Sequence, residues 1–164
     1  MKILSERQIN QKIKRLAFEI VEENYDEPQI ILAGINNNGV HFGKLLLSEL
    51  KKITDIDLIM TSINLNPADP LSQEIEIDYP HNELKGKVII IIDDVANTGR
   101  TIFYAVKPLL AVLPKKVEAA VLIDRKHKSF PIRVDYVGLS LATTLKEDID
   151  VRIRGVDEMS VYLN

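Results

Sequence analysis

The chain has 164 residues, of which 46% are hydrophobic and 27% are charged, a composition typical of one globular domain with a substantial core. Its formal net charge of −3 argues against a general basic field for nucleic acid or anionic lipid, although a local basic patch is compatible with it. The absence of cysteine excludes disulfides, zinc–thiolate sites and thiol nucleophiles. The opening residues are amphipathic and charged, unlike a secretory signal, and no apolar run is long enough to span a membrane. We therefore expect a single cytoplasmic domain over residues 1–164.

The first third of the chain carries two helical patterns. Residues 5–24 begin with a capping box at Ser5 and Gln8, after which apolar residues recur at helical spacing. A short apolar run at residues 29–34 leads into an Asn- and Gly-rich segment. A second helix is expected to follow and to end near Lys52. Its candidate core positions are Val40, Leu46, Leu47 and Leu50.

The middle of the chain contains a long segment without a clear period. Residues 56–63 alternate loosely and predict a strand, whereas residues 64–83 contain three prolines and predict a flexible loop. Within that loop, residues 72–78 alternate well enough to predict a short hairpin arm. A loop of this length inside a compact domain is usually functional or disordered.

The second half alternates apolar strands with one helical pattern. Residues 87–92 form a continuous apolar run, which is typical of a parallel strand buried on both faces. A helix over residues 100–113 should be kinked or interrupted at Pro108. Further strands are expected at residues 117–123, 134–140, 151–153 and 161–163. Repeated strand–helix–strand units predict an α/β fold with a doubly wound, Rossmann-like parallel sheet flanked by helices.

The segment over residues 88–101 carries the clearest chemical signal. Its buried strand ends in Asp93 and Asp94, at the sheet edge where open α/β sheets bind ligands. The turn that follows contains Thr98, Gly99 and Thr101, whose hydroxyls and backbone N–H groups suit a phosphate. The paired carboxylates suit sugar hydroxyls or Mg²⁺, directly or through water. These features predict a ligand with a diol or metal at one end and a phosphate at the other, such as ribose 5-phosphate.

Two other classes of protein place similar residues after a strand. A receiver domain has paired acids on its first strand, whereas the pair here lies in the middle of the chain and a hydroxyl-rich turn follows it at once. A P-loop requires the pattern G-x-x-x-x-G-K-[ST], which the sequence lacks. Each feature taken alone also fits a solvated strand end or a common helix cap.

The full motif resembles the phosphoribosyl-pyrophosphate (PRPP) motif of type I phosphoribosyltransferases. Its residues are Asp93-Asp94-Val95-Ala96-Asn97-Thr98-Gly99-Arg100-Thr101. Residues 15–20, 120–127 and 131–138 are also similar to one branch of that family, the bacterial pyrimidine-operon attenuation proteins that double as uracil phosphoribosyltransferases. The resemblance covers most of the chain but is poor over residues 64–83.

The resemblance implies a type I phosphoribosyltransferase fold with a small hood formed by the C-terminal strands. It assigns the ribose hydroxyls and Mg²⁺ to Asp93 and Asp94, and the 5-phosphate to the remainder of the motif. It places Asp124 and Arg125 near the nucleobase and pyrophosphate, so Asp93, Asp94 and Arg125 are the expected catalytic residues. The expected pyrophosphate loop consists of Gly34, Ile35, Asn36, Asn37, Asn38 and Gly39. Relatives form dimers or tetramers, which implies a homo-oligomer.

The sequence departs from the family pattern where pyrophosphate should bind. Relatives in this branch carry basic residues in the pyrophosphate loop and the mobile loop, whereas this chain has Asn36-Asn37-Asn38 and no Lys or Arg between residues 53 and 84. An acidic loop would repel pyrophosphate unless a metal intervened. Two explanations are compatible with the sequence: cations are recruited from elsewhere, including a neighbouring subunit, or nucleotide binding is retained without efficient transfer.

The expected function is the transfer of a phosphoribosyl group from PRPP to a nucleobase, a pyrimidine such as uracil, with Mg²⁺ required. One alternative is a nucleotide-responsive RNA-binding regulator of pyrimidine operons, and another is a non-catalytic PRPP- or nucleotide-binding protein of the same fold. The regulator is disfavoured because the chain is acidic and lacks several basic residues that the family's regulators carry. The residues available for a basic RNA-binding face are Lys12, Lys14, Arg15, Lys126, Lys128 and Arg133.

Overall fold

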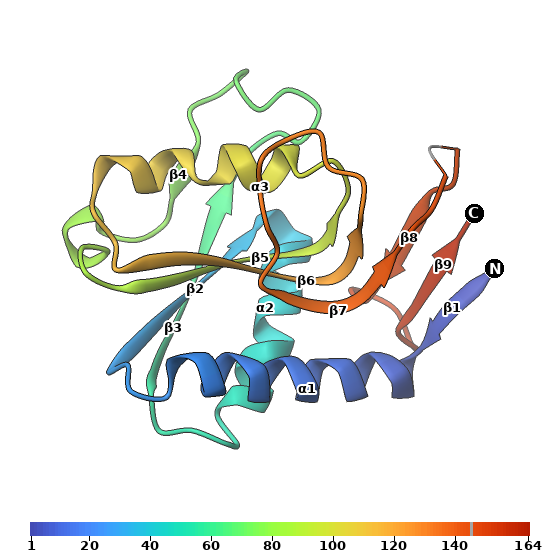
Figure 1. Ribbon diagram of the computed structural model, residues 1–164, viewed down its shortest axis with the longest axis horizontal. Helices are drawn as coiled ribbons and strands as arrows, with labels where there is room; N and C mark the ends of the chain where they lie inside the picture. The colour runs from blue at the N-terminus through green and yellow to red at the C-terminus, as the bar shows by residue number, and fades with distance from the viewer. Residues whose placement is uncertain (145) are drawn as a thin grey trace.

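A six-stranded sheet forms the centre of the computed structural model, which describes residues 1–144 and 146–164. Its strand order is β4-β3-β2-β5-β6-β7, and all neighbours are parallel except the β3–β4 pair (Figure 1). The strands are β2 (Gln29–Ile35), β3 (Asp57–Asn64), β4 (Glu76–Ile77), β5 (Val88–Ala96), β6 (Lys116–Arg125) and β7 (Tyr136–Leu141). The doubly wound parallel sheet expected from the sequence is confirmed.

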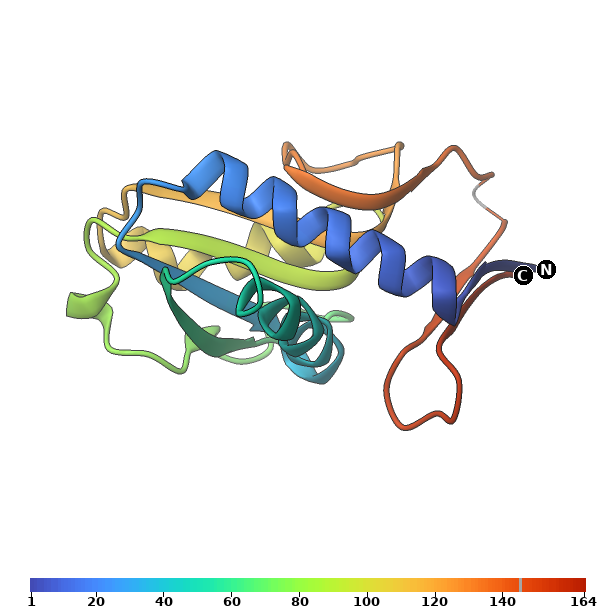
Figure 2. The ribbon, with the colours of Figure 1, turned by 90° about the horizontal axis from the view of Figure 1, so that it is seen from below.

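Helices cover both faces of this sheet. The long helices α1 (Glu6–Asn24) and α2 (Asn36–Leu50) lie on one face, and α3 (Arg100–Ala105) with the 3-10 helix η2 (Lys107–Ala111) lies on the other (Figures 1 and 2). A short 3-10 helix, η1 (His81–Glu83), precedes β5. Because β2 and β5 are adjacent but lead into helices on opposite faces, the sheet has its topological switch point between them.

A second, three-stranded antiparallel sheet stands beside the carboxyl ends of the parallel strands (Figures 1 and 2). It contains β1 (Lys2–Ser5), β9 (Ser160–Leu163) and β8 (Ile149–Arg152), in that order. The two terminal strands expected from the sequence are confirmed, whereas β1 had no recognisable pattern. The small sheet thus brings both ends of the chain together and carries them to the edge where the parallel strands end.

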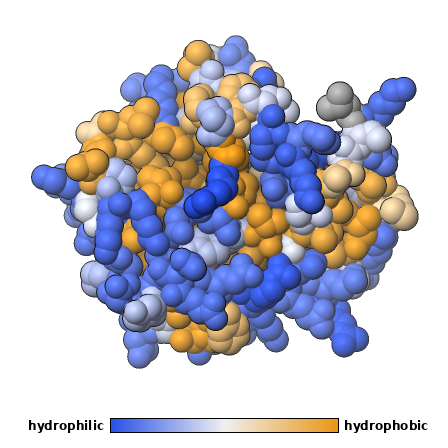
Figure 3. Space-filling view, in the orientation of Figure 1, coloured by the Kyte–Doolittle hydropathy of each residue, from blue (hydrophilic) through white to orange (hydrophobic). Residues whose placement is uncertain are grey.

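The outer surface is mixed in character. Figure 3 shows hydrophobic residues gathered over the α3–η2 segment, where Phe103 and Leu110 are exposed. Within the described residues, none of the helices combines the length and the apolar character that a bilayer crossing requires.

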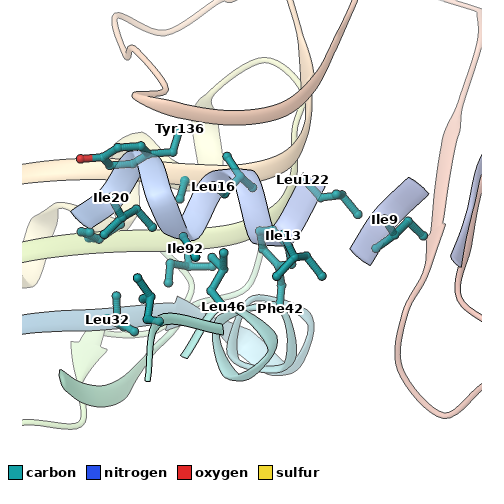
Figure 4. Packing of buried hydrophobic residues seen from close by; sticks show 14 of the residues in the cluster. Ile9, Ile13, Leu16, Ile20, Leu32, Phe42, Leu46, Ile92, Leu122 and Tyr136 are labelled. Atoms are coloured by element: carbon teal, nitrogen blue, oxygen red, sulfur yellow. The ribbon is translucent and has the colours of Figure 1, made fainter. Parts of the chain in front are cut away.

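The core consists of two apolar layers, one on each face of the central sheet. Alternate side chains of β5 enter different layers: Ile90 and Ile92 pack beneath α1 and α2, whereas Ile89 and Ile91 pack beneath α3. Leu16 and Phe42 extend from the two long helices into the first layer (Figure 4). A run of β-branched residues therefore fixes β5, and the acids that follow it, in the middle of the sheet.

Two details differ from the sequence-based expectations, and a third agrees with them. The strand β5 is longer than expected and includes Asp93 and Asp94, because its pairing with β6 continues to Ala96. Residues 72–78 do not form a hairpin arm, since only β4 forms and it pairs back onto β3. Burial of Leu65, Ile75 and Ile77 against the α3 side of the sheet explains this folding back. The interruption expected at Pro108 is confirmed, as α3 ends before it and η2 begins.

Candidate active site

The candidate site lies where β2 and β5 end, at the switch point of the sheet. Open α/β sheets bind ligands in the crevice outside the carboxyl ends of strands at such a point. A cleft of about 480 Å³ opens here, and its walls come from the β2–α2 junction, the end of β5 and the small sheet. The sequence motif over residues 93–101 and the Asn-rich segment therefore meet, although some 60 residues separate them along the chain.

Two carboxylates form the floor of the cleft. Asp93 and Asp94 are half-buried, and each accepts a hydrogen bond of 2.9 Å from the backbone N–H of the residue that follows it. Burial, followed by the neighbouring negative charge of Asp94, raises the pKa of the Asp93 carboxyl well above its ordinary value. A cation or a pair of sugar hydroxyls placed over these oxygens would offset that unfavourable electrostatic environment.

The turn after β5 forms a second, adjoining hollow of about 230 Å³, lined by residues 95–102 and Pro67. Gly99 adopts a left-handed conformation with φ of 86°, and a Cβ atom there would lie 2.6 Å from Cγ1 of Ile132. The Thr98 carbonyl accepts backbone hydrogen bonds from Ser129 and Phe130. These contacts hold the turn in place, and the Thr98 hydroxyl accepts a hydrogen bond of 3.4 Å from the Arg100 N–H. The turn, which is rich in hydroxyl and N–H groups, therefore lines a hollow of the kind that suits a phosphate.

Gly34 and Gly39 allow the backbone of the Asn-rich segment to pack closely against its surroundings at the cleft. A Cβ at Gly39 would lie 2.4 Å from the Ile92 carbonyl oxygen, and one at Gly34 would lie 2.5 Å from the Val40 backbone. The segment is the junction of a strand and a helix, because β2 ends at Ile35 and α2 begins at Asn36. Because Gly39 has no side chain, the first turn of α2 can lie directly beside the end of β5.

Asn36 connects the α2 junction to the long loop. Its backbone has φ of 52°, a conformation that asparagine tolerates better than most residues. Its side chain donates a hydrogen bond of 2.9 Å to the Leu65 carbonyl and accepts one of 3.0 Å from the Leu65 N–H. The start of residues 64–83 is therefore held against the cleft, where Pro67 forms part of the wall.

Arg154 reaches the cleft from the loop between β8 and β9. It donates a hydrogen bond of 3.2 Å through Nε to Oδ1 of Asn38, and Asn38 in turn donates one of 3.2 Å to Oδ2 of Asp94. Sequence reasoning missed this residue because it belongs to no motif and lies 60 positions after Asp94. Only the folded position of the small sheet shows that it faces the cleft.

Asp124 and Arg125 lie beside the site but outside the main cleft. Arg125 and the motif residue Asn97 line a small cavity of about 50 Å³. The Arg125 guanidinium donates to Thr143, at 2.7 Å, and to the Thr144 carbonyl, at 2.9 Å, while Asp124 forms an ion pair with Lys128. These contacts give Arg125 a clear part in holding Thr143, Thr144 and Glu147. Its expected catalytic role remains a prediction.

The two carboxylates on the cleft floor could bind Mg²⁺ if a bound substrate supplied further oxygen ligands. Among the described residues, no group of three or more His, Asp or Glu side chains is arranged to hold a metal alone. Mg²⁺ is commonly held by one or two carboxylates together with substrate oxygens, and Asp93 and Asp94 supply two adjacent carboxylates. The residues therefore match a metal that arrives with a phosphorylated substrate.

Comparison with known proteins agrees with this architecture. The family model described as phosphoribosyl transferase domain matches residues 2–157. The "Bifunctional protein PyrR" of Streptococcus gordonii is 36% identical over 152 residues, covering 91% of this chain and 88% of that protein. The "Bifunctional protein PyrR" of Clostridium acetobutylicum is 34% identical over 167 residues, covering 96% and 92%.

Solved structures show the same fold. The hypoxanthine phosphoribosyltransferase of Trypanosoma cruzi superposes with a TM-score of 0.79 at 18% identity, covering 98% of this chain and 94% of that one. A hypoxanthine-guanine phosphoribosyltransferase from Bacillus anthracis gives a TM-score of 0.71 at 20% identity, covering 85% and 81%.

The central sheet, the switch-point cleft and these superpositions define a type I phosphoribosyltransferase fold. The chain belongs to the phosphoribosyltransferase family, and its similar relatives carry the name Bifunctional protein PyrR. It is accordingly an enzyme of the phosphoribosyltransferase class, as the sequence motif predicted.

Proposed function

We propose that this protein transfers the 5-phosphoribosyl group of PRPP to a pyrimidine base, uracil, and releases pyrophosphate. The observation that carries this proposal is the meeting of three elements at one cleft: two carboxylates, a turn suited to phosphate and the start of α2. Uracil comes from the similarity to the attenuation-protein branch. The role in the cell would be pyrimidine salvage in the cytoplasm.

Each part of the cleft has a role in this reaction. Residues 97–101 bind the 5-phosphate, and the carboxylates of Asp93 and Asp94 accept hydrogen bonds from the ribose hydroxyls. The bond between C1 of ribose and the pyrophosphate oxygen breaks with its electrons on that oxygen. A bond from a ring nitrogen of the base to C1 forms, and that nitrogen loses its proton. The first turn of α2 lies where the leaving pyrophosphate would be held.

Asp93 and Asp94 would also hold Mg²⁺ together with substrate oxygens. When bound, the ion would stabilise negative charge on the departing phosphate oxygens. Burial and the neighbouring charge of Asp94 raise the pKa of Asp93, and among the described residues no cationic side chain pairs with either carboxylate. Both observations support this assignment, because a bound cation would offset the repulsion between the two carboxylates.

A homo-oligomer is also proposed. The residues Leu71, Phe103 and Leu110 are exposed and line an apolar groove of about 500 Å³ beside α3 and η2. Exposed apolar patches of this kind commonly mark protein–protein interfaces, and a second copy of the chain is the partner that the family resemblance suggests.

The regulatory alternative has weaker support, because carboxylates already neutralise half of the candidate basic face. Arg15 pairs with Glu19 at 3.3 Å, and Lys128 and Arg133 form ion pairs with Asp124 and Asp135. A hollow of about 430 Å³ that includes Arg133 is lined largely by acidic residues. They are Glu19, Glu22, Glu23, Glu118 and Asp135. Such a surface repels the phosphate backbone of RNA.

The test is a transfer assay with PRPP, Mg²⁺ and a panel of pyrimidine and purine bases, read by formation of nucleoside monophosphate. We expect product with uracil. Measurable PRPP binding without product from any base would instead support the non-catalytic alternative. Binding to a pyrimidine-operon RNA leader that falls steeply with salt would support the regulator.

A further inference from the structure

The pyrophosphate end of the cleft has one unexplained feature, the absence of positive charge on the two segments expected to supply it. Asn36, Asn37 and Asn38 are neutral, and the loop that contributes Pro67 has no Lys or Arg. A leaving group that carries several negative charges requires cationic or metal partners in a site that excludes water. A cationic side chain that acts together with Mg²⁺ would therefore come from another part of the molecule.

Arg154 is the one cationic side chain among the described residues that line the main cleft. It is exposed to solvent, and the loop that carries it turns sharply at Gly155, whose φ is 66°. Its guanidinium thus projects from the small sheet toward the first turn of α2, on the opposite wall.

The hydrogen bonding of Arg154 leaves its terminal donors available. Its Nε donates to Asn38, and no carboxylate in the described part of the chain lies within ion-pair distance of it. Other arginines near the site differ in this respect. Arg125 is held by Thr143 and the neighbouring backbone, and Arg100 donates to the Pro67 carbonyl.

We propose that Arg154 binds the pyrophosphate group of PRPP and replaces the cation that the Asn-rich segment and the long loop lack. Asn38 orients the guanidinium through Nε, so that its two terminal amino groups face the phosphate oxygens as a planar fork. The proposal rests on the proposed function, since it names the group that holds the leaving end of that substrate. The small sheet thereby becomes part of the pyrophosphate site.

A purely structural role for Arg154 predicts a different result. If the Arg154–Asn38 contact served only to fasten the small sheet, its loss would weaken every ligand of the cleft alike. A direct role affects only ligands that contain pyrophosphate. Comparing pyrophosphate and PRPP with uridine monophosphate, which has the 5-phosphate but no pyrophosphate, therefore separates the two roles.

The experiment uses Arg154→Gln and Arg154→Lys, with Arg152→Gln as the matched control. Arg152 lies two residues away in β8, pairs with Asp150 and stacks on Tyr162 at 4.6 Å, outside the cleft. Calorimetric titration measures the affinities for Mg²⁺-pyrophosphate, PRPP and uridine monophosphate, and steady-state kinetics gives kcat and KM for PRPP.

For Arg154→Gln we expect affinities for pyrophosphate and PRPP to fall by about 10- to 100-fold, the range for losing a hydrogen bond to a charged partner. The affinity for uridine monophosphate should stay as in the wild type. Arg154→Lys should recover part of the loss because it restores the charge without the fork, and Arg152→Gln should match the wild type.

Wild-type affinity for pyrophosphate in Arg154→Gln would overturn this proposal, as would an equal loss for uridine monophosphate. Both results leave the proposed function intact if the wild type forms product. The proposed function can also fail by itself. If the wild type forms no product but its binding of pyrophosphate depends on Arg154, the proposed function is wrong and the role of Arg154 is retained. A wild type that binds none of the three ligands would remove both.

Discussion

Adjacent residues of the same type have different surroundings on the cleft floor. Because side chains alternate along β5, Asp93 and Asp94 lie on different sides of the strand. Asp94 accepts a hydrogen bond from Asn38. The pKa of Asp93 is raised by burial and by the negative charge of Asp94. From the motif, the sequence predicted that these two carboxylates lie at the ligand-binding edge of the sheet. Their position within the strand, rather than after it, depends on pairing with β6, which the residues themselves do not encode.

Replacing both carboxylates by Asp93→Asn with Asp94→Asn should abolish binding of Mg²⁺-PRPP while the fold is kept. The amides retain the size of the side chains but remove the negative charge that Mg²⁺ requires and weaken the acceptors for the ribose hydroxyls. Calorimetric titration measures the binding, and circular dichroism monitors the fold.

The control for this pair is Asp57→Asn, at the start of β3, two strands from β5 and at the opposite edge of the sheet, where Asp57 contacts Gln29. It should bind PRPP as the wild type does. Unchanged PRPP affinity in the double variant would contradict the assignment of the cleft floor.

Gly99→Ala should weaken binding of ribose 5-phosphate and destabilise the protein. The left-handed backbone costs a residue with a Cβ about 1–2 kcal/mol, and the contact 2.6 Å from Ile132 must be relieved by moving the turn. Ligand titration and chemical denaturation measure the two effects.

Gly86→Ala is a close control, since Gly86 has φ of 71° but no atom within 4 Å of the added Cβ. It should show the cost in the free energy of unfolding without the loss of phosphate binding. Equal ligand affinity in both variants would mean that the turn does not bind the phosphate.

At the scale of elements, residues 64–83 illustrate how tertiary contacts override a local pattern. Three prolines and the absence of helical spacing predicted a loop, which is largely what the structure contains. The alternation at residues 72–78 predicted a hairpin, but its apolar side chains pack on the central sheet instead, because burial there removes more apolar surface from water than an isolated hairpin could.

Asn36→Ala should release the start of this loop from α2. The change removes two hydrogen bonds to Leu65, each contributing about 0.5–1.5 kcal/mol, and leaves alanine in a left-handed conformation. We expect faster hydrogen exchange at the Leu65 amide and a higher KM for PRPP.

Asn36→Gly separates the two causes, since glycine removes the hydrogen bonds but tolerates the backbone conformation. It should show the same exchange at Leu65 with a smaller loss of stability. Protection of the Leu65 amide in both variants would show that Asn36 does not hold the loop.

At the scale of the whole molecule, the groove beside α3 and η2 provides a test of self-association. Leu110 is 75% exposed and lines this groove, so Leu110→Glu would place a charge in a buried interface. If the wild type is a homo-oligomer through this surface, sedimentation velocity should show the variant shifted toward monomer.

Tyr25→Glu serves as the control, because Tyr25 is 76% exposed but follows α1 on the other side of the sheet. It should sediment as the wild type does. A monomeric wild type, or an oligomer unaffected by Leu110→Glu, would place any assembly elsewhere.

The sequence by itself determined the class of fold and predicted the centre of the candidate site. Continuous apolar runs identified the buried parallel strands, and residues 93–101 identified the phosphoribosyltransferase motif, because both signals are local and depend on neighbouring residues. Only the tertiary structure decided that β1 joins the small sheet and that Arg154 faces Asn38 across the cleft. Contacts between residues more than a hundred positions apart follow from how the elements pack, which a local pattern does not report.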